Sequence, residues 1–518
     1  LINQRNLIPV PCVGLRAHAP PRPVRGRHAY PCLGSDKRRG ERVLPKPSAC
    51  QGCPAYGNGM GYVGDEIRQQ SPIVLYGQGP GADEEAGRRY LGGERYEPCA
   101  PAPFTGRTGR MLEQTFLPLA GLTREDVSLA NTLRCRWGKT NELPPLTKPE
   151  MRQAIAHCTQ AHWRSPDNVK VYVAMGEYAT YALTGISRDF SGWRGYIAPQ
   201  RHPWEPLSPM TTVWTPSEHV GDRLPVFITH HLAYLFKEPT AALPAKRDWN
   251  KLATILKGDW PVKMSPIESE PPAPWPSYAA FDTEFVEDQH GRLVRYSLAS
   301  MDRRVWVVEA HQARPSVTLP GTTVIMHNAP ADLPHLRGIL DVDRVTIEDT
   351  MYAHACLWTG KVETDEEGAK GSRGGGAMSH TLNFLGSMYA QINRWKHLAR
   401  VAPRLYAGGD AMGTMDVWTT GLNGGLLGEL ERDPETKWVY ENLQKPLVGI
   451  VLKHHQRGIA TDQEQVKVAL KDLERNQMVA VQKAHAYTGW PFNLRSPQQL
   501  AYWLYTVEGL KTKRRARR

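Results

Sequence analysis

Tyr278-Ala-Ala-Phe-Asp-Thr-Glu-Phe285 is an apolar, β-prone stretch that contains two carboxylates, Asp282 and Glu284. Residues two apart on a strand project from the same face, so both acids are expected to point into one place. Neighbouring acids repel each other unless a cation lies between them, and Mg²⁺ or Mn²⁺ suits such oxygen ligands. The alternative is an exposed edge strand with two solvated acids, which an isolated D-x-E motif does not exclude.

Two further motifs with carboxylates follow this stretch. Residues 322–327 are predicted to form a buried strand, after which Asn328-Ala-Pro-Ala-Asp332 opens a helix-like run through Leu340. Tyr406 and Asp410 lie four residues apart, which puts them on one face if the segment is helical. Three glycines each cost that helix roughly 1 kcal/mol relative to alanine: Gly408, Gly409 and Gly413.

These motifs, D-x-E, N-x-x-x-D and Y-x-x-x-D in this order, resemble the proofreading 3′–5′ exonuclease domain of family A DNA polymerases. The segment from Glu348 to His354 is similar to the family's stretch between its second and third motifs. The resemblance implies a ribonuclease H-like exonuclease domain at residues 277–425, acting on single-stranded 3′ ends of DNA. It also implies two Mg²⁺ or Mn²⁺ ions about 3.5–4 Å apart, with the ligands Asp282, Glu284, Asp332 and Asp410.

The same resemblance implies roles for the other motif residues. Tyr406 would orient the attacking water with help from Glu284, and Asn328 would contact DNA. One ion would activate the water and the other would stabilise the leaving 3′ oxygen. A core-facing aromatic is the alternative for Tyr406, and its spacing from Asp410 favours the catalytic role.

The length of 518 residues predicts two or three domains. The formal net charge is +12, of which residues 1–47 contribute +8 and the last eight residues +6, so the remainder carries about −2. The basicity therefore lies in the tails and does not by itself make either domain a DNA binder. Residues 1–47 are rich in Pro, Arg and Gly and do not begin with Met, which predicts a disordered basic arm or sequence outside the natural start.

Targeting signals are absent from the sequence. No apolar run approaches the roughly 18 residues needed to span a bilayer, and no signal-peptide pattern is found. We therefore expect no membrane partner and a cytoplasmic protein of a bacterial or phage-infected cell. Eight scattered cysteines argue against a disulfide scaffold in that setting.

Four of the cysteines form a candidate metal site near the start of the first folded domain. Cys50-Gln-Gly-Cys53 is a C-x-x-C pair, and Cys135 and Cys158 follow it. Four thiolates can hold zinc or a [4Fe–4S] cluster, and spacing alone does not separate these options. Unrelated free cysteines are a third reading of the same residues.

Residues 48–258 alternate strands with helices. Strands are predicted at residues 73–77, 127–136, 169–176 and 225–231, and an amphipathic helix ends at Leu119. This alternation predicts a three-layer α/β domain with a mostly parallel sheet. Ligands bind outside the carboxyl ends of such strands, where Gln78, Asn131 and His231 fall.

These segments resemble the family 4 uracil-DNA glycosylases across about residues 48–240. The similarity rests on five motifs: Gly77 to Gly81, Pro103 to Gly106, Asn131 to Arg136, the Arg194-Gly195 turn, and His231-Leu-Ala-Tyr234-Leu. That family carries a four-cysteine iron–sulfur cluster. The resemblance therefore favours [4Fe–4S] over zinc at Cys50, Cys53, Cys135 and Cys158.

A glycosylase must take its base out of the stack. By resemblance, Phe104 would stack on the extruded uracil, Asn131 would read its polar edge, and His231 would stabilise negative charge growing on O2. Gln78 belongs to the same predicted uracil-binding site, and the backbone amides from Gly79 to Gly81 would hold a flanking phosphate. The alternatives are a core Phe, a turn-forming Asn and a structural His.

Three features depart from the glycosylase family. Gln78 stands where the family usually has Glu, and an amide cannot accept a proton as a general base. Leu232 stands where related motifs have Pro, and an insertion from Leu91 to Ala102 lengthens the loop before Phe104. Active uracil excision and a degenerate domain that only binds or scans DNA are both left open.

The linker and the tail complete the chain. Residues 259–276 are rich in proline and are predicted to be an extended spacer, and residues 365–377 are predicted to be a mobile loop. Residues 438–518 turn helical and, from Glu441 to Asp462 and from Phe492 to Leu500, resemble the entry to the polymerase domain of family A enzymes. With no palm or fingers following, we expect the front portion of a split or truncated polymerase.

The main hypothesis is a DNA-processing enzyme with two hydrolytic sites, a uracil-glycosylase-like domain and a metal-dependent proofreading exonuclease. Its expected partners are single-stranded 3′ ends, uracil-containing DNA and a separate polymerase subunit, an arrangement that suits a phage replication protein. The alternative is a non-catalytic DNA-binding accessory that tethers such a polymerase to its template. A ribonuclease of the same fold is a third option, which the polymerase-like tail disfavours.

Overall fold

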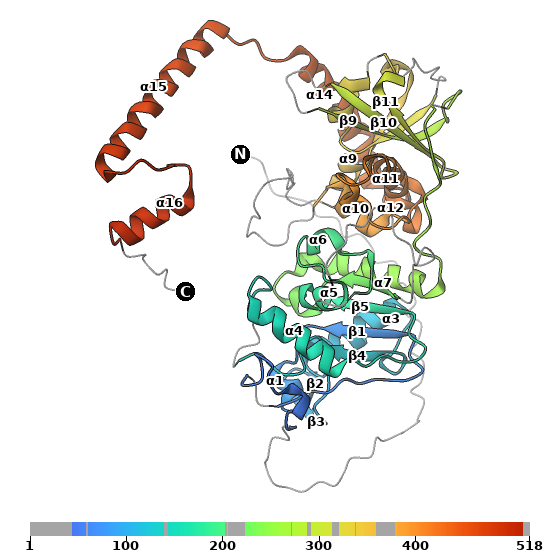
Figure 1. Ribbon diagram of the computed structural model, residues 1–518. Coiled ribbons are helices and arrows are strands. Elements are labelled where there is room, and N and C mark those ends of the chain that lie inside the picture. Colours follow the sequence, from blue (N-terminus) through green and yellow to red (C-terminus); the bar gives the residue numbers. More distant parts are fainter. Residues whose placement is uncertain are drawn as a thin grey trace, which may run out of the picture.

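The computed structural model describes residues 44–58, 61–138, 143–201, 205, 223–270, 272–286, 292–312, 321–336, 338–358 and 379–510. Figure 1 shows two α/β domains and a helical tail. Most of the predicted basic arm, the predicted loop at residues 365–377 and the basic end at residues 511–518 lie outside the described residues.

The first domain is built on a five-stranded sheet in the order β4-β1-β5-β7-β6, parallel except for β6. The strands are β1 (Ile73–Gly77), β4 (Ser128–Asn131), β5 (Val171–Met175), β6 (Ile197–Pro199) and β7 (Pro225–Thr229). The predicted strand at residues 127–136 is shorter than expected, because the chain turns after Asn131 and the Thr132 N–H bonds Gly77. The predicted mostly parallel sheet is confirmed.

Helices cover both faces of this sheet, so that β1 is buried throughout. Ile73 and Leu75 face one apolar cluster, while Val74 and Tyr76 face another, as the alternation of a strand requires. This gives the three layers that the sequence predicted. The helices are α1 (Ala82–Glu85), α2 (Arg107–Met111), α3 (Leu117–Leu119), α4 (Pro149–His162), α5 (Glu177–Thr184), α6 (Phe190–Trp193) and α7 (Ala242–Lys257).

The second domain has a six-stranded mixed sheet in the order β13-β12-β9-β10-β11-β8. Its strands are β8 (Ile267–Glu268), β9 (Tyr278–Phe285), β10 (Leu293–Ser300), β11 (Val305–Glu309), β12 (Thr323–Met326) and β13 (Thr346–Asp349). Its helices are α8 (Ala329–Asp332), α9 (Thr350–Leu357), α10 (Leu382–Tyr389), α11 (Pro403–Met415) and α12 (Gly425–Arg432). The helix-like run predicted through Leu340 is interrupted: a 3₁₀ turn replaces it after Asp332, where Pro334 lacks the amide donor that an α-helix needs.

Helix α11 forms in spite of its three glycines, and packing explains why. A Cβ added at Gly409 would lie 2.5 Å from the Trp395 ring, and one at Gly413 would lie 2.4 Å from it. A Cβ added at Gly408 would lie 3.0 Å from the side chains of Ile267 in β8 and Val305 in β11. The glycines let α11 approach the sheet and Trp395 closely, which offsets their low helix propensity.

The predicted spacer is packed along much of its length. Trp260 is buried and donates its indole N–H to Ala390 O at 3.0 Å, and the Val262 N–H bonds Gln391 O at 2.8 Å. Ile267 and Glu268 then pair with β11 as the edge strand β8. The linker therefore holds the two domains against each other and does not act as a free spacer.

A buried polar network joins the two domains. Arg194, on the first domain's Arg-Gly turn, pairs with Asp248 at 2.5 Å and hydrogen-bonds Ser387 of α10. Lys251 donates to the Ser387 carbonyl oxygen at 2.6 Å and to Gly195 O at 3.0 Å. Because these charged groups are buried, each needs its partner from the other domain or from its neighbour.

Replacement of Ser387 with Ala is expected to lower the free energy of unfolding by about 1–3 kcal/mol, because a buried guanidinium loses a hydrogen-bond partner. Thermal and denaturant unfolding of the whole chain measure this change. Ser379→Ala is the matched control, because Ser379 is only partly buried and its hydroxyl contacts Thr381 instead of a charged group, so this change should affect stability far less. Equal stability of the Ser387 variant and the parent chain would show that the interface does not depend on this contact.

The tail consists of α13 (Pro434–Val439), α14 (Lys445–Arg457), α15 (Gln463–Thr488) and α16 (Pro497–Tyr502). Val448 and Leu452 of α14 pack into the second domain's core, whereas α15 has no buried residue and stands away from both domains in Figure 1. The predicted helical character of this region agrees with the structure. Within the part of the chain that is described, no helix combines the length and the apolar character needed to cross a bilayer.

Candidate active sites

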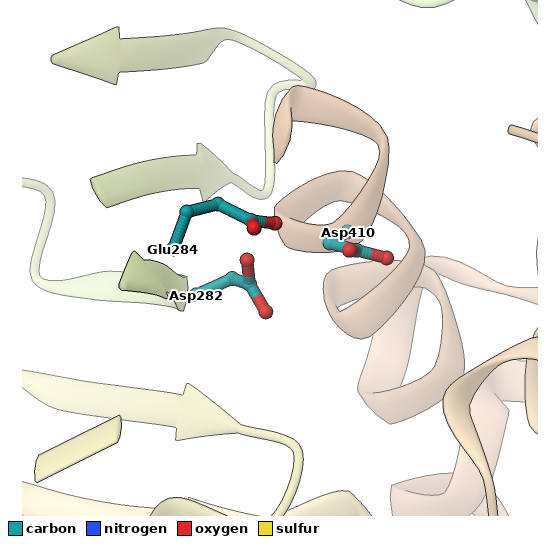
Figure 2. A group of neighbouring side chains, drawn as sticks. All are labelled: Asp282, Glu284 and Asp410. Atoms are coloured by element: carbon teal, nitrogen blue, oxygen red, sulfur yellow. The ribbon is translucent and has the colours of Figure 1, made fainter. Parts of the chain in front are cut away.

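The first candidate site is a group of three carboxylates in the second domain. Asp282 and Glu284 project from β9 and Asp410 from α11, and one oxygen from each lies within 4.8 Å of the others (Figure 2). The burial of β9 alternates around the two acids, which places both on one face as their spacing predicted. Asp282 Oδ2 is buried without a hydrogen-bond partner among the described residues, as expected of an oxygen reserved for a cation.

Asp332 lies beside this group but has protein partners of its own. Its Oδ1 accepts hydrogen bonds from the Thr283 amide at 3.2 Å and from the Thr283 hydroxyl at 2.5 Å. Burial raises the pKa of Asp332 to about 7, although the two hydrogen bonds from Thr283 act to lower it. Burial, Asp410 and Asp332 together raise the pKa of Asp282 well above its usual value. Four acids from three separate motifs thus share one electrostatic environment.

Lys396 was not anticipated from the sequence. Its ammonium lies 2.6 Å from Asp410 Oδ1 and 3.3 Å from the Tyr406 hydroxyl, and the Trp395 indole N–H donates to the same Asp410 oxygen at 2.6 Å. The Lys396 charge offsets part of the acid cluster and holds Tyr406 towards Asp410. Trp395 and Lys396 precede the third motif in the sequence, but their spacing from Tyr406 and Asp410 does not indicate this contact.

Asp349 lies in the segment from Glu348 to His354 that resembles the exonuclease family, although no role was predicted for it. It is 1% exposed, and its carboxylate accepts the amide N–H groups of Asn328, Ala329, Met351 and Tyr352. Asn328 itself adopts φ +66°, so these bonds hold the turn that starts the second motif in a strained conformation. Asp349 therefore positions the Asn328–Asp332 segment.

The raised pKa of Asp332 predicts how stability of the metal-free protein depends on pH. A carboxyl whose folded pKa lies above its unfolded value binds a proton more tightly when folded, so its stabilisation is lost as pH rises. Without divalent ions, melting temperature should fall between about pH 5 and pH 8 through this group, and Mg²⁺ should restore it at the higher pH. Asp332→Asn should flatten this fall. An unchanged pH profile in that variant would contradict the assignment.

The second candidate site lies at the carboxyl ends of β1, β4 and β5. The parallel register pairs Gly77 with Asn131, and a Cβ added at Gly77 would lie 2.5 Å from Asn131 Oδ1 and 2.7 Å from the Phe104 ring. A Cβ added at Gly176 would lie 2.6 Å from Gln78 Nε2 and 2.8 Å from His231 Cβ. The two glycines therefore make room for four side chains predicted to recognise uracil.

Phe104 and Asn131 are held in place by neighbouring groups. Phe104 has φ +56°, its N–H donates to the Glu84 carboxylate at 2.7 Å, and Arg124 donates to its carbonyl oxygen at 3.0 Å. Asn131 is 2% exposed, and its Nδ2 has no hydrogen-bond partner among the described residues. A buried amide donor without a partner is suited to a ligand carbonyl.

His231 carries its proton on a defined nitrogen. Nδ1 accepts the Ala233 N–H at 3.3 Å, so the neutral ring has its proton on Nε2. Burial lowers the pKa of His231 to about 4, which keeps the ring neutral at physiological pH. The ring can therefore donate one hydrogen bond from Nε2 without bringing a positive charge into the site.

One backbone amide of the glycine-rich turn is already bonded to Glu84, a residue that the sequence did not single out. The Gly81 N–H donates to Glu84 at 2.9 Å, so the same carboxylate bonds both Gly81 and Phe104. Burial raises the pKa of Glu84 to about 7 against these bonds. Gly79 packs against Leu133, and no hydrogen bond is found for its amide among the described residues.

The four predicted cysteines gather around one cavity of about 20 Å³, together with His162 and Tyr62. Cys50 Sγ lies 3.1 Å from His162 Nε2, a neighbour that spacing did not suggest. No three of the four sulfurs lie within 4.8 Å of one another. Zinc with bonds of about 2.3 Å would bring tetrahedral sulfurs closer than this, so the donor set fits a larger cluster better. Burial raises the pKa of Cys135 to about 12 when no metal is bound.

Comparison with known proteins locates relatives of the first domain. Residues 65–255 match the uracil DNA glycosylase superfamily model. The type-4 uracil-DNA glycosylase of Thermotoga maritima is 32% identical over 141 residues, 27% of this chain and 62% of the relative. That of Archaeoglobus fulgidus is 29% identical over 146 residues, 28% of this chain and 63% of the relative. The chain thus spans less than two thirds of the length of these relatives.

Other similarities are shorter or weaker. DNA polymerase I of a Synechocystis species is 31% identical over 86 residues, 17% of this chain and 9% of the relative. The polymerase domain of Pol1 from M. smegmatis gives a TM-score of 0.31 at 18% identity, covering 46% of this chain and 38% of that chain. Escherichia coli RNase D gives 0.24 at 15% identity, covering 36% and 46%. Residues 65–255 are therefore similar to the uracil DNA glycosylase superfamily and to its type-4 enzymes.

Proposed function

We propose that this chain is a DNA-processing enzyme with two hydrolytic sites. Its first domain excises uracil from DNA, which the similarity to type-4 uracil-DNA glycosylases supports. Its second domain is a metal-dependent 3′–5′ exonuclease. The observation that carries the second activity is the convergence of Asp282, Glu284 and Asp410, with Asp332 beside them.

In the exonuclease site, Asp282, Glu284, Asp332 and Asp410 would hold two Mg²⁺ or Mn²⁺ ions. Such ions supply an activated water and stabilise charge on the leaving 3′ oxygen. The Tyr406 hydroxyl, held near Asp410 by Lys396, would orient the water. Asn328, fixed by Asp349, would contact the DNA strand.

In the glycosylase site, Phe104 would stack on the extruded uracil while Asn131 Nδ2 donates to its polar edge. His231 Nε2 would donate to uracil O2 as the glycosidic bond breaks and negative charge grows there. This requires neutral His231, in keeping with its lowered pKa. Gln78 cannot act as a base, so we assign it to binding and to orienting the water that completes hydrolysis.

The cysteines would hold a [4Fe–4S] cluster that fixes the fold around Cys50, Cys53, Cys135 and Cys158. The cluster has a structural role in this proposal, because the cluster site and the uracil pocket use different residues. A visible absorption band in anaerobically purified protein, together with iron analysis, tests the assignment. Bound zinc in a colourless protein would contradict it.

The two activities are tested with the complete chain and two oligonucleotides. Release of free uracil from U-containing DNA is expected without added metal, and degradation of a labelled single strand from its 3′ end is expected with Mg²⁺. DNA affinity without either reaction would favour a non-catalytic accessory of a separate polymerase. Preferred degradation of RNA would favour a ribonuclease. The helical tail, with its similarity to polymerase entry segments, is assigned to contact with such a polymerase.

A further inference from the structure

The insertion from Leu91 to Ala102 belongs to a β-hairpin that neither proposed site uses. Strands β2 (Arg88–Gly92) and β3 (Arg95–Pro98) pair antiparallel as a two-stranded sheet of their own. Figure 1 shows the hairpin at the edge of the first domain, next to α1. All residues of β3 are exposed. The hairpin is thus available to a partner of the glycosylase domain.

The hairpin is fixed to the turn that carries Phe104. The Tyr90 N–H donates to Thr105 O at 2.8 Å, directly after Phe104, and the Cys99 N–H closes the base of the hairpin on Gly87 O at 2.9 Å. The Arg107 guanidinium, at the start of α2, lies over the Tyr90 ring at 5.5 Å. Any partner bound by the hairpin is therefore held at a set position relative to the uracil pocket.

Aromatic rings and guanidinium groups alternate on this hairpin. Tyr96 is 39% exposed and lies against Tyr90, with ring centroids 5.3 Å apart. Arg88 lies over the Tyr96 ring at 5.5 Å. An exposed tyrosine such as Tyr96, flanked by arginines, is suited to base stacking and to phosphate contacts.

Three arginines here have no carboxylate partner among the described residues, namely Arg95, Arg107 and Arg110. By contrast, Arg88 pairs with Asp83 and Arg89 with Glu113. Arg95 and Arg107 are exposed, and the Arg110 guanidinium lies against the hairpin turn, 3.0 Å from where a Gly92 Cβ would be. Unpaired positive charge thus runs from α2 to the hairpin tip.

We propose that the hairpin, together with Arg107 and Arg110 of α2, is a DNA-backbone-binding element beside the uracil pocket. The proposal rests on the proposed glycosylase function and names where this site holds its substrate. An extruded base leaves its flanking phosphates close to the turn that stacks on it, and arginines bind phosphates without reading sequence. Glu94 and Glu97 of the hairpin limit the net charge, so the binding depends on the unpaired arginines and Tyr96.

The test uses the complete chain and a covalently closed dumbbell duplex, which has no 3′ end for the exonuclease site. Affinity is measured by fluorescence anisotropy on a dumbbell with an abasic analogue, at several salt concentrations. The double variant Arg95→Ala, Arg107→Ala should weaken binding about tenfold and reduce the slope of log K against log salt by about 2. In single-turnover uracil release, the half-saturating protein concentration should rise while the maximal rate stays nearly unchanged.

The matched control is Glu97→Gln in the same strand, which should bind at least as tightly as the parent chain. An unchanged affinity and salt slope in the double variant would overturn the proposal, as would an equal loss in the control. A parent chain that binds the dumbbell but releases no uracil would contradict the glycosylase function. The anisotropy result would then test DNA binding by the hairpin on its own. A lower maximal rate at unchanged affinity would assign the arginines to the pocket's shape instead.

Discussion

Replacing Asp282 with Asn is expected to lower the rate of 3′-end degradation by about 10³-fold, while uracil release stays unchanged. The substitution keeps the shape of the side chain but removes a charge shared with Glu284 and Asp410. A pair of divalent ions contributes several kcal/mol of transition-state stabilisation, and each 1.36 kcal/mol corresponds to about tenfold in rate. Single-turnover digestion of a 3′-labelled strand in Mg²⁺ measures the change.

Asp302→Asn is the matched control, because Asp302 is an exposed acid in the turn between β10 and β11 of the same sheet. Its activity should equal that of the parent chain. Calorimetric titration of Mg²⁺ or Mn²⁺ supplies a second readout, in which Asp282→Asn should bind fewer ions or bind them more weakly. Full nuclease activity in Asp282→Asn would mean that the activity arises elsewhere, and the acid cluster would then be structural.

Residues within one strand or helix could be placed from the sequence because their relations are local. The spacing of Asp282 and Glu284 follows from the period of a strand, and that of Tyr406 and Asp410 from the period of a helix. The parallel sheet of the first domain was predictable for the same reason. The rule that ligands bind at the carboxyl ends of such strands then placed Asn131 and His231 at one edge of that sheet, whereas the pairing of Asn131 with Gly77 comes from the structure.

Contacts between distant segments could not be placed in this way. Lys396 reaches Asp410 because Trp395 packs against the glycines of α11, a tertiary arrangement that no periodicity encodes. Arg194 and Ser387 are 193 residues apart, and their contact depends on how the domains meet. The linker composition suggested an extended spacer, whereas burial of Trp260 and pairing of β8 decide its actual course.

The interface has a consequence for how the two sites act. Thr229, at the end of β7 and two residues before His231, donates to Asp248 at 2.7 Å. Asp248 in turn pairs with Arg194, which bonds Ser387 of the second domain. The strand that precedes His231 is therefore connected to the second domain through buried charged groups. Removal of the second domain should disturb the glycosylase site as well as overall stability.

Replacing His231 with Ala is expected to lower the rate of uracil release by about 10²–10³-fold, the usual cost of removing one donor to a developing negative charge. The residue donates from Nε2 because its Nδ1 is occupied by the Ala233 N–H. Burial lowers the pKa of His231 to about 4. The rate of uracil release should therefore not change with the protonation of His231 above about pH 6. Single-turnover uracil release across pH measures both effects.

His230→Ala is the matched control for this variant. The neighbouring ring stacks on Tyr234 at 5.2 Å and lies edge-on to Phe190, so its role is packing. His230→Ala should lower the stability of the fold slightly and leave the rate of uracil release within a few-fold of the parent chain. If His231→Ala retained full activity while His230→Ala lost it, the donor to uracil O2 would be His230 and not His231. If neither lost activity, charge on uracil O2 would have to be stabilised by another donor, for which the unpartnered Asn131 Nδ2 is the candidate in this site.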